Sequence, residues 1–200
     1  MTNDTKGNQL FPVFLRLDQL HMLVVGGGSV GYEKISAIFK NSDNAIVTLV
    51  APEIREEIKE IAAQYPLLTL IQRDYHYNDL DGKDLVIAAT NIPDLNKRVR
   101  EDARRKKILI NVADTPEICD FYLSSVVKKG DLKIAISTNG KSPTFAKRVR
   151  EMLEEVLPDG IDTVLDNLRS IREKLKGDFE YKVKKLNEIT SVFKGNDDIK

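Results

Sequence analysis

The chain has 200 residues, with 31 Lys and Arg balanced by 31 Asp and Glu, so its formal net charge is zero. This balance argues against a nucleic-acid-binding protein, which normally carries a basic excess, and no apolar run approaches the roughly 20 residues of a membrane-spanning helix. The amino terminus lacks the apolar core of an export signal, and the one cysteine, Cys119, excludes an internal disulfide. We therefore expect a cytoplasmic protein with neither a membrane nor a nucleic acid as partner.

Apolar, β-branched runs alternate with helical patterns as far as Val112. After an extended or edge-strand segment at 10–17, we expect strands at 20–25, 45–50, 67–72, 84–89 and 108–112. The helices expected between them are 30–40, 52–64 and 93–107. Five alternations predict the α/β class, a Rossmann-type parallel sheet in the order 3-2-1-4-5 with helices on both faces.

A glycine-rich turn joins the first strand to the first helix. Gly26, Gly28 and Gly31 match the spacing G-x-G-x-x-G. The first glycine permits a tight turn, the second lets a pyrophosphate approach the backbone, and the third lets the helix pack closely on the strand. The phosphates would bind free N–H groups at the helix amino terminus. The motif predicts a dinucleotide site.

Ligands of such sheets bind beyond the carboxyl ends of the strands, near the switch point. Glu53 is the first acid after the second strand, and it would either bind the ribose hydroxyls or stabilise the start of its helix. No arginine stands directly at that strand end, although Arg55 is near, so we expect NAD rather than NADP. Four strand ends are expected to converge on one crevice: Gly26–Gly31, Pro52-Glu53, Thr90-Asn91 and Val112–Asp114.

The pattern changes after Asp114. Two extended runs, 121–129 and 132–138, flank Gly130-Asp131 and predict a β-hairpin, which is marginal alone and must pair with the main body or with a second copy. Helices are expected from Ser142-Pro143, with an apolar stripe of Phe145, Val149, Met152 and Val156, then at 161–175 and 181–193, ahead of a frayed tail at 194–200. The expected domains are 1–113 for NAD binding, 114–145 for dimerisation through the hairpin, and 146–200 for the helical part.

The sequence resembles the siroheme-synthase dehydrogenase module, the precorrin-2 dehydrogenases, some of which also insert iron into sirohydrochlorin. The resemblance covers roughly residues 10–157, and its last segment is the most distinctive because a generic Rossmann protein has no reason to carry it. Five segments carry it: FPVF at 11–14, GGGSVGYEK at 26–34, VTLVAPE at 47–53, NVADTPE at 111–117 and IAISTNGKSPTFAKRVRE at 134–151.

The resemblance implies a homodimer that oxidises precorrin-2 to sirohydrochlorin with NAD⁺ as hydride acceptor. It places the catalytic aspartate at Asp114, where a carboxylate could take the proton or orient the reacting carbon. From the residues alone, Asp114 could equally form a turn or cap ahead of Pro116. The cofactor contacts that the resemblance implies are Gly26, Gly27, Gly28, Ser29, Val30, Gly31, Pro52 and Glu53, and the convergence of the strand ends adds Thr90 and Asn91.

The substrate is a flat macrocycle with many carboxylates, which calls for cations and N–H donors around an apolar slot. The expected substrate-binding residues are Thr138, Lys141, Ser142 and Arg148, whereas Lys147 and Arg150 read as the solvated face of an amphipathic helix. Some members of the family have serine where this chain has Thr138.

Metal insertion stays an open second activity, because neither His21 nor His76 belongs to a cluster of potential metal ligands, and we expect no resident metal site. A non-catalytic NAD-binding sensor is the main alternative function. Tyr181 and Lys185 match Y-x-x-x-K of short-chain dehydrogenases but follow the predicted Rossmann unit, so we interpret them as a chance match. A purely scaffolding role would leave the glycine turn without a use.

Overall fold

A computed structural model describes residues 7–190 of the chain, which cluster into two units. The first unit contains the residues up to Ser125 together with Ser137–Pro143, and the second contains Val126–Ile136 and the residues from Thr144 onward. The chain therefore passes between the units after Ser125, Ile136 and Pro143. The division expected from the sequence, after residues 113 and 145, stays a prediction.

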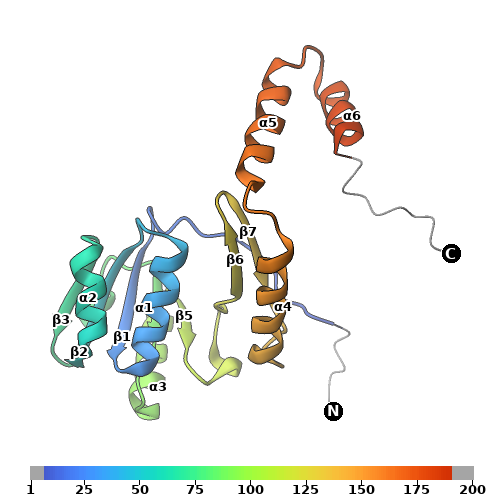
Figure 1. Cartoon of the computed structure of the whole chain (residues 1–200). Helices are drawn as coiled ribbons and strands as arrows, with labels where there is room; N and C mark the ends of the chain where they lie inside the picture. The colour runs from blue at the N-terminus through green and yellow to red at the C-terminus, as the bar shows by residue number, and fades with distance from the viewer. Residues whose placement is uncertain (1–6, 191–200) are drawn as a thin grey trace. The chain divides into compact units, whose positions relative to one another are not determined.

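A five-stranded parallel sheet forms the centre of the first unit, in the order β3-β2-β1-β4-β5 (Figure 1). This confirms the predicted fold class and strand order. The strands alternate with helices along the chain, as a parallel sheet requires. They are β1 (His21–Gly27), β2 (Ile46–Ile54), β3 (Leu68–Gln72), β4 (Leu85–Ala88) and β5 (Leu109–Val112).

Helices cover both faces of this sheet (Figure 1). On one face, α1 (Ser29–Asn41) and α2 (Glu56–Gln64) bury apolar side chains against the strands, including Phe39, whose ring stacks on Tyr65 with 4.5 Å between centroids. On the other face, α3 (Pro93–Arg105) buries Val99 and Ala103. Burial on both faces explains why the central strands are almost continuously apolar.

The second strand is longer than the sequence predicted, and the prediction that Pro52 opens the second helix is wrong. β2 continues to Ile54, which pairs with Gly27, and the N–H of Arg55 donates a hydrogen bond to the carbonyl of Gly27 at 3.0 Å. Helix α2 begins only at Glu56. Pairing with the end of β1 holds this segment extended. The preference of proline for the first turn of a helix is a local rule, and it takes no account of a pairing strand that is distant in the sequence.

The segment at 10–17 forms no strand in the described part of the chain, so the edge-strand alternative is wrong. It carries four strongly exposed apolar side chains, those of Phe11, Val13, Phe14 and Leu15. Its end is attached to the sheet, because the N–H of Ile46 donates to the carbonyl of Leu17 at 3.0 Å.

A returning segment covers the outer edge of β5, next to the short helix η2 (Pro116–Ile118). Asp120 donates its N–H to the carbonyl of Ile110 at 2.8 Å, and its carboxylate accepts from the N–H of Ile110 at 3.1 Å. The Cys119 thiol accepts from the N–H of Val112 at 3.1 Å and lies 3.2 Å from its carbonyl. Burial raises the pKa of Cys119, so its thiol stays protonated. The thiol thus satisfies backbone groups of β5 that a neighbouring strand would otherwise bind.

The second unit contains the hairpin of β6 (Ser125–Lys129) and β7 (Leu132–Ile136), shorter at both outer ends than the sequence predicted. Its turn is held by α5 and the residues just before it: Asp162 accepts from the N–H of Asp131 at 2.8 Å, and Lys129 pairs with Asp159 at 2.5 Å. Gly130 has a φ of 56°, as the turn requires. The helices are α4 (Pro143–Val156), α5 (Ile161–Lys174) and α6 (Phe179–Ile189).

Helix α6 begins two residues before the expected start, because Asp178 caps it by accepting from the N–H of Tyr181 at 2.9 Å. The expected end of this helix at 193 and the expected tail at 194–200 lie outside the described residues. Within residues 7–190, none of the helices combines the length and the apolar character needed to cross a bilayer.

We expect acid to destabilise the first unit through His21. Its Nε2 lies 2.8 Å from the Thr48 hydroxyl and its Nδ1 lies 3.4 Å from the Lys83 amine. Burial, and secondarily the Lys83 charge, lower the pKa of His21 below the unfolded value, whereas Asp84 opposes the shift. The unfolded chain therefore binds more protons, and stability falls as the pH drops through about 6.5.

The measurement is the melting temperature at pH 7.5 and pH 5.5. His21→Gln should lose less stability on acidification than the wild type, whereas the control His76→Gln, at an exposed histidine, should follow the wild type. Equal losses in all three proteins would contradict this assignment.

Candidate dinucleotide and substrate site

The glycine turn between β1 and α1 has the geometry of a phosphate cradle. Gly26 has a φ of 121°, and a Cβ there would lie 2.4 Å from the carbonyl oxygen of Ala89. A Cβ at Gly31 would lie 2.1 Å from the Gly26 carbonyl oxygen, so only glycine lets α1 start this close to β1. In contrast, a Cβ at Gly28 would meet nothing within 4 Å, which leaves the space through which a pyrophosphate can approach.

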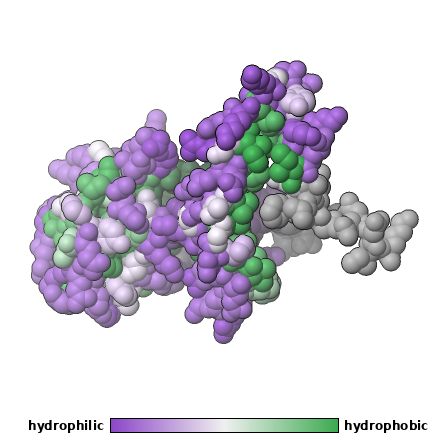
Figure 2. Space-filling model, turned by 45° about the horizontal axis from the view of Figure 1, so that its top comes forward, coloured by the Kyte–Doolittle hydropathy of each residue, from purple (hydrophilic) through white to green (hydrophobic). Residues whose placement is uncertain are grey.

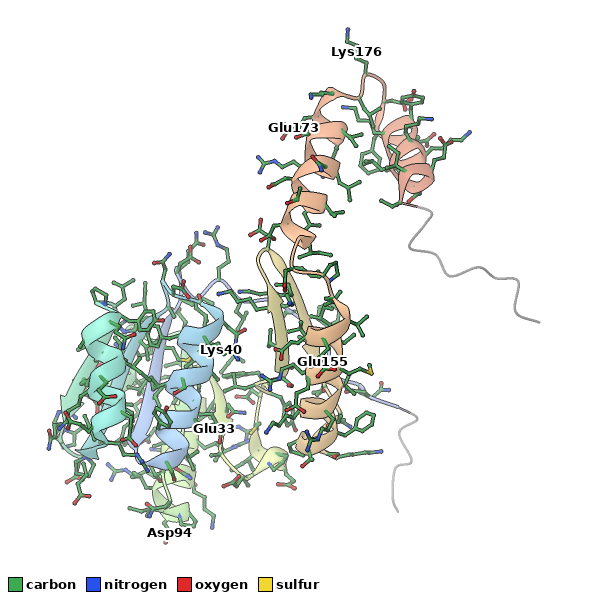
Figure 3. The ribbon with its side chains drawn as sticks, in the orientation of Figure 1. Glu33, Lys40, Asp94, Glu155, Glu173 and Lys176 are labelled. Atoms are coloured by element: carbon green, nitrogen blue, oxygen red, sulfur yellow. The ribbon has the colours of Figure 1, made fainter. Side chains whose placement is uncertain are left out.

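The amino terminus of α1 faces this space. Among the described residues, no side chain caps the helix at Gly28, so its first N–H groups remain available to an anion. In Figure 3, Glu33 near the start of α1 and Asp94 near the start of α3 mark the edge of the sheet at which the strands end. These features fit the pyrophosphate of a dinucleotide.

A crevice of about 530 Å³ opens at this edge of the sheet. Its walls come from the ends of β1, β2 and β4 and from the segment after β3. The lining residues are Val25, Gly26, Gly27, Gly28, Ser29, Val30, Val50, Ala51, Pro52, Glu53, Ile54, Arg55, Asp74, Tyr75, Ala89, Thr90, Asn91, Ile92 and Leu95.

The structure brings together in this crevice nearly all the cofactor-binding residues expected from the sequence. Gly31 is the exception, because it packs beneath the turn instead of lining the crevice. The expectation that Val112–Asp114 lies at the same crevice is not met by the lining residues, because none of these three is among them. Asp74 and Tyr75, which follow β3, line it instead.

Sequence reasoning missed three polar residues of this crevice, Arg55, Asp74 and Tyr75. Asp74 and Tyr75 follow β3, so the rule applied to the other strand ends would have found them. The Arg55 guanidinium is paired with Glu57, which raises the pKa of Arg55, and it lies 6.0 Å from the centre of the Tyr32 ring.

Tyr75 is a buried wall of the crevice, 4 % exposed. Its hydroxyl donates to the carboxylate of Asp102 on α3 at 3.2 Å, and the Arg98 guanidinium lies 5.9 Å from its ring centre. Burial raises the pKa of Tyr75, and the Asp102 charge adds to the shift, so the phenol stays protonated and keeps donating. This bond fastens the segment after β3 to α3.

Asp114 lies just beyond β5, exposed, with a φ of 56°. The preceding residue, Ala113, donates its N–H to the carbonyl of Ala88 at the end of β4 at 2.9 Å, and Thr115 donates its N–H to Val112 at 3.4 Å. Residue 114 therefore follows the carboxyl end of β5, and its exposed side chain is not among the residues that line the crevice.

The expected substrate-binding residues fall in both units. Thr138, Lys141 and Ser142 lie in the loop that belongs to the first unit. There the Thr138 hydroxyl accepts from the N–H of Ser142 at 3.2 Å and lies 3.1 Å from the Ser142 carbonyl. Arg148 lies on α4 in the second unit and pairs with Glu151 at 2.8 Å. Across residues 7–190, no three His, Cys, Asp or Glu side chains are grouped so as to hold a metal ion.

The fold and the glycine cradle define a dinucleotide-binding Rossmann protein. A family model described as putative NAD(P)-binding matches residues 13–125, and the chain belongs to this family. This confirms that the cofactor is a nicotinamide dinucleotide. A second model, described as sirohaem biosynthesis protein central, matches residues 129–155, and together the two matches confirm the resemblance to the amino-terminal module of siroheme synthases.

Individual relatives agree with this assignment. Siroheme synthase of Pseudoalteromonas translucida is 37% identical over 173 residues, which are 86% of this chain and 36% of the relative. Siroheme synthase of Nitrosomonas europaea is 32% identical over 168 residues, 84% of this chain and 35% of the relative. The chain thus spans about a third of the length of these relatives.

A solved structure described as SirC, precorrin-2 dehydrogenase, is similar over almost the whole chain. Its TM-score is 0.71 at 28% identity, and the match covers 90% of this chain and 89% of that chain. The similarity therefore includes both units, not the Rossmann sheet alone.

Proposed function

We propose that this protein oxidises precorrin-2 to sirohydrochlorin with NAD⁺, in the cytoplasm. The observation that carries the proposal is the combination of a glycine cradle at the end of β1 with a fold similar, over 90% of the chain, to a precorrin-2 dehydrogenase. A non-catalytic sensor would need the cradle but not the residues beyond β5.

The oxidation removes a hydride and a proton from the reduced macrocycle, and NAD⁺ supplies the hydride acceptor. Asp114 is the proposed proton acceptor, because its exposed carboxylate stands at the edge of the sheet where the dinucleotide crevice opens. Its backbone, tied to the end of β4 through Ala113, holds the carboxylate at that edge. The Gly28 turn and the start of α1 bind the pyrophosphate.

For the substrate we propose the loop at 137–143 of the first unit. Lys141 is exposed and supplies a cation, while Thr138 holds the loop closed through Ser142. Arg148, on α4 of the second unit, is proposed separately as a cation for carboxylates of the macrocycle.

The test mixes the purified full chain with precorrin-2 and NAD⁺ and follows sirohydrochlorin and NADH by absorbance. Equal amounts of both products should form, and omitting NAD⁺ or replacing it with NADP⁺ should slow the reaction. NADH binding without any oxidation of precorrin-2 would favour the sensor and overturn the proposal. A further Fe²⁺- or Co²⁺-dependent spectral change, faster than without protein, would reveal metal insertion.

We further propose that the second unit forms a homodimer. The apolar stripe of α4 is open to solvent at Phe145, Met152 and Val156, which are 62%, 54% and 74% exposed. Figure 2 shows more apolar side chains, in green, on the carboxyl-terminal helices. A two-stranded hairpin beside such a stripe gains stability when a second copy covers it.

Replacing Val156 by Asp should convert the dimer to a monomer, because an unpaired charge would be buried in the interface. Analytical ultracentrifugation measures the mass. The matched control is Glu155→Lys, an exposed charge reversal on the adjacent position of α4, which should stay dimeric (Figure 3). A wild type that sediments as a monomer at micromolar concentration would refute the dimer.

A further inference from the structure

Asn96 is a buried polar residue on α3, 7 % exposed, that does not line the crevice. Both ends of its side-chain amide form hydrogen bonds with Thr90, which does line the crevice. The Asn96 amide nitrogen donates to the Thr90 carbonyl at 3.0 Å, and its amide oxygen accepts from the Thr90 hydroxyl at 2.7 Å and from the Thr90 N–H at 3.3 Å. Both ends of this buried amide are thus bonded to a single residue, and these bonds fix the position of Thr90.

The polar groups of Thr90 are consequently used inside the protein. Its hydroxyl also accepts from the N–H of Ile92 at 3.1 Å. Thr90 therefore contributes shape to the crevice more than hydrogen bonds. The position of its backbone depends on Asn96.

That backbone is also the surface against which the glycine turn packs. A Cβ on Gly26 would lie 2.4 Å from the Ala89 carbonyl oxygen and 3.0 Å from the Thr90 nitrogen, so the turn and the Ala89–Thr90 peptide are in direct contact. Any shift of this peptide would move the Gly26 turn, or open a gap beneath it. Asn96, Thr90 and Gly26 thus form a continuous chain from α3 to the phosphate cradle.

We propose that Asn96 is a positioning residue for the dinucleotide: it sets the Ala89–Thr90 peptide and thereby the height of the Gly26 turn, without touching the cofactor. This inference rests on the proposed dinucleotide site. The role predicts a change in cofactor affinity, with little change in the rate once the cofactor is saturating.

The experiment compares Asn96→Leu and Asn96→Asp with the wild type. Leucine fills a similar volume but makes none of the bonds, and it should weaken NADH binding about tenfold, as expected from the loss of one or two buried hydrogen bonds. Aspartate keeps both acceptor contacts but sets a carboxylate oxygen against the Thr90 carbonyl, so it should weaken NADH binding at least as much as leucine does. The readout is NADH fluorescence titration well below the melting temperature.

Asn111 on β5 provides the matched control. It is also a buried asparagine, 8 % exposed, and its amide donates to the Phe121 carbonyl at 2.9 Å, outside the crevice. Asn111→Leu should lower the melting temperature but leave the NADH dissociation constant unchanged. If both leucine variants lose stability and neither loses NADH affinity, Asn96 is only structural and the inference falls.

A different result identifies failure of the proposed function itself. If the wild type does not bind NADH, the dinucleotide assignment falls, whatever Asn96 does. If the wild type binds NADH but does not oxidise precorrin-2, the proposed activity falls while the affinity comparison still tests Asn96. In an active protein, Asn96→Leu should raise the KM for NAD⁺ and leave kcat within about twofold.

Discussion

Asp114→Asn is expected to abolish precorrin-2 oxidation while leaving NADH binding intact. Asparagine removes the charge and the proton-accepting capacity, and a missing general base typically slows a reaction by about 10²- to 10⁴-fold. Asparagine is preferred to alanine because residue 114 has a φ of 56°, a conformation that asparagine tolerates and that strains alanine. The measurement is the initial rate of sirohydrochlorin formation at saturating NAD⁺, beside an NADH titration.

Glu117→Gln is the control for this variant, because Glu117 is an exposed carboxylate in the same segment, three positions further on. It should retain the wild-type rate. Turnover by Asp114→Asn at the wild-type rate would remove Asp114 from the reaction and restore the interpretation that it forms only a turn. Loss of NADH binding in the same variant would point to a misplaced strand end instead.

Substitution of two glycines in one motif should affect different properties: NADH affinity at Gly28 and fold stability at Gly31. Gly28→Val should leave the melting temperature nearly unchanged, because a Cβ there meets nothing within 4 Å and the backbone, with φ −84°, suits any residue. The new side chain would occupy the space of the pyrophosphate, and NADH affinity should fall on the order of a hundredfold.

Gly31→Ala should instead destabilise the fold. Its Cβ would lie 2.1 Å from the Gly26 carbonyl oxygen, a backbone atom that cannot move alone, and overpacking of this kind costs roughly 1–3 kcal/mol. Thermal unfolding with and without NADH separates the two effects. Gly160→Ala, at a glycine with open space outside the crevice, is the control and should behave like the wild type. Equal losses of stability at Gly28 and Gly31 would contradict the assignment of different roles.

The local pattern of the sequence was sufficient for the sheet and for the cradle. Continuous apolar runs such as that of β1 can be buried only in a sheet covered on both faces, and their alternation with helices permits few topologies. The spacing of Gly26, Gly28 and Gly31 then located the phosphate site, because each glycine meets a steric requirement of the strand–turn–helix unit itself.

The tertiary structure decided what depends on partners distant in the chain. Pro52 is extended because β2 pairs with the end of β1, and Asn96 reaches back to Thr90 only after α3 has packed on the sheet. Tyr75 becomes a crevice wall through its bond to Asp102. A local sequence pattern indicates the backbone preference and the burial of its own segment. The contacts described above depend on which segments the sheet order places next to each other, so only the folded chain reveals them.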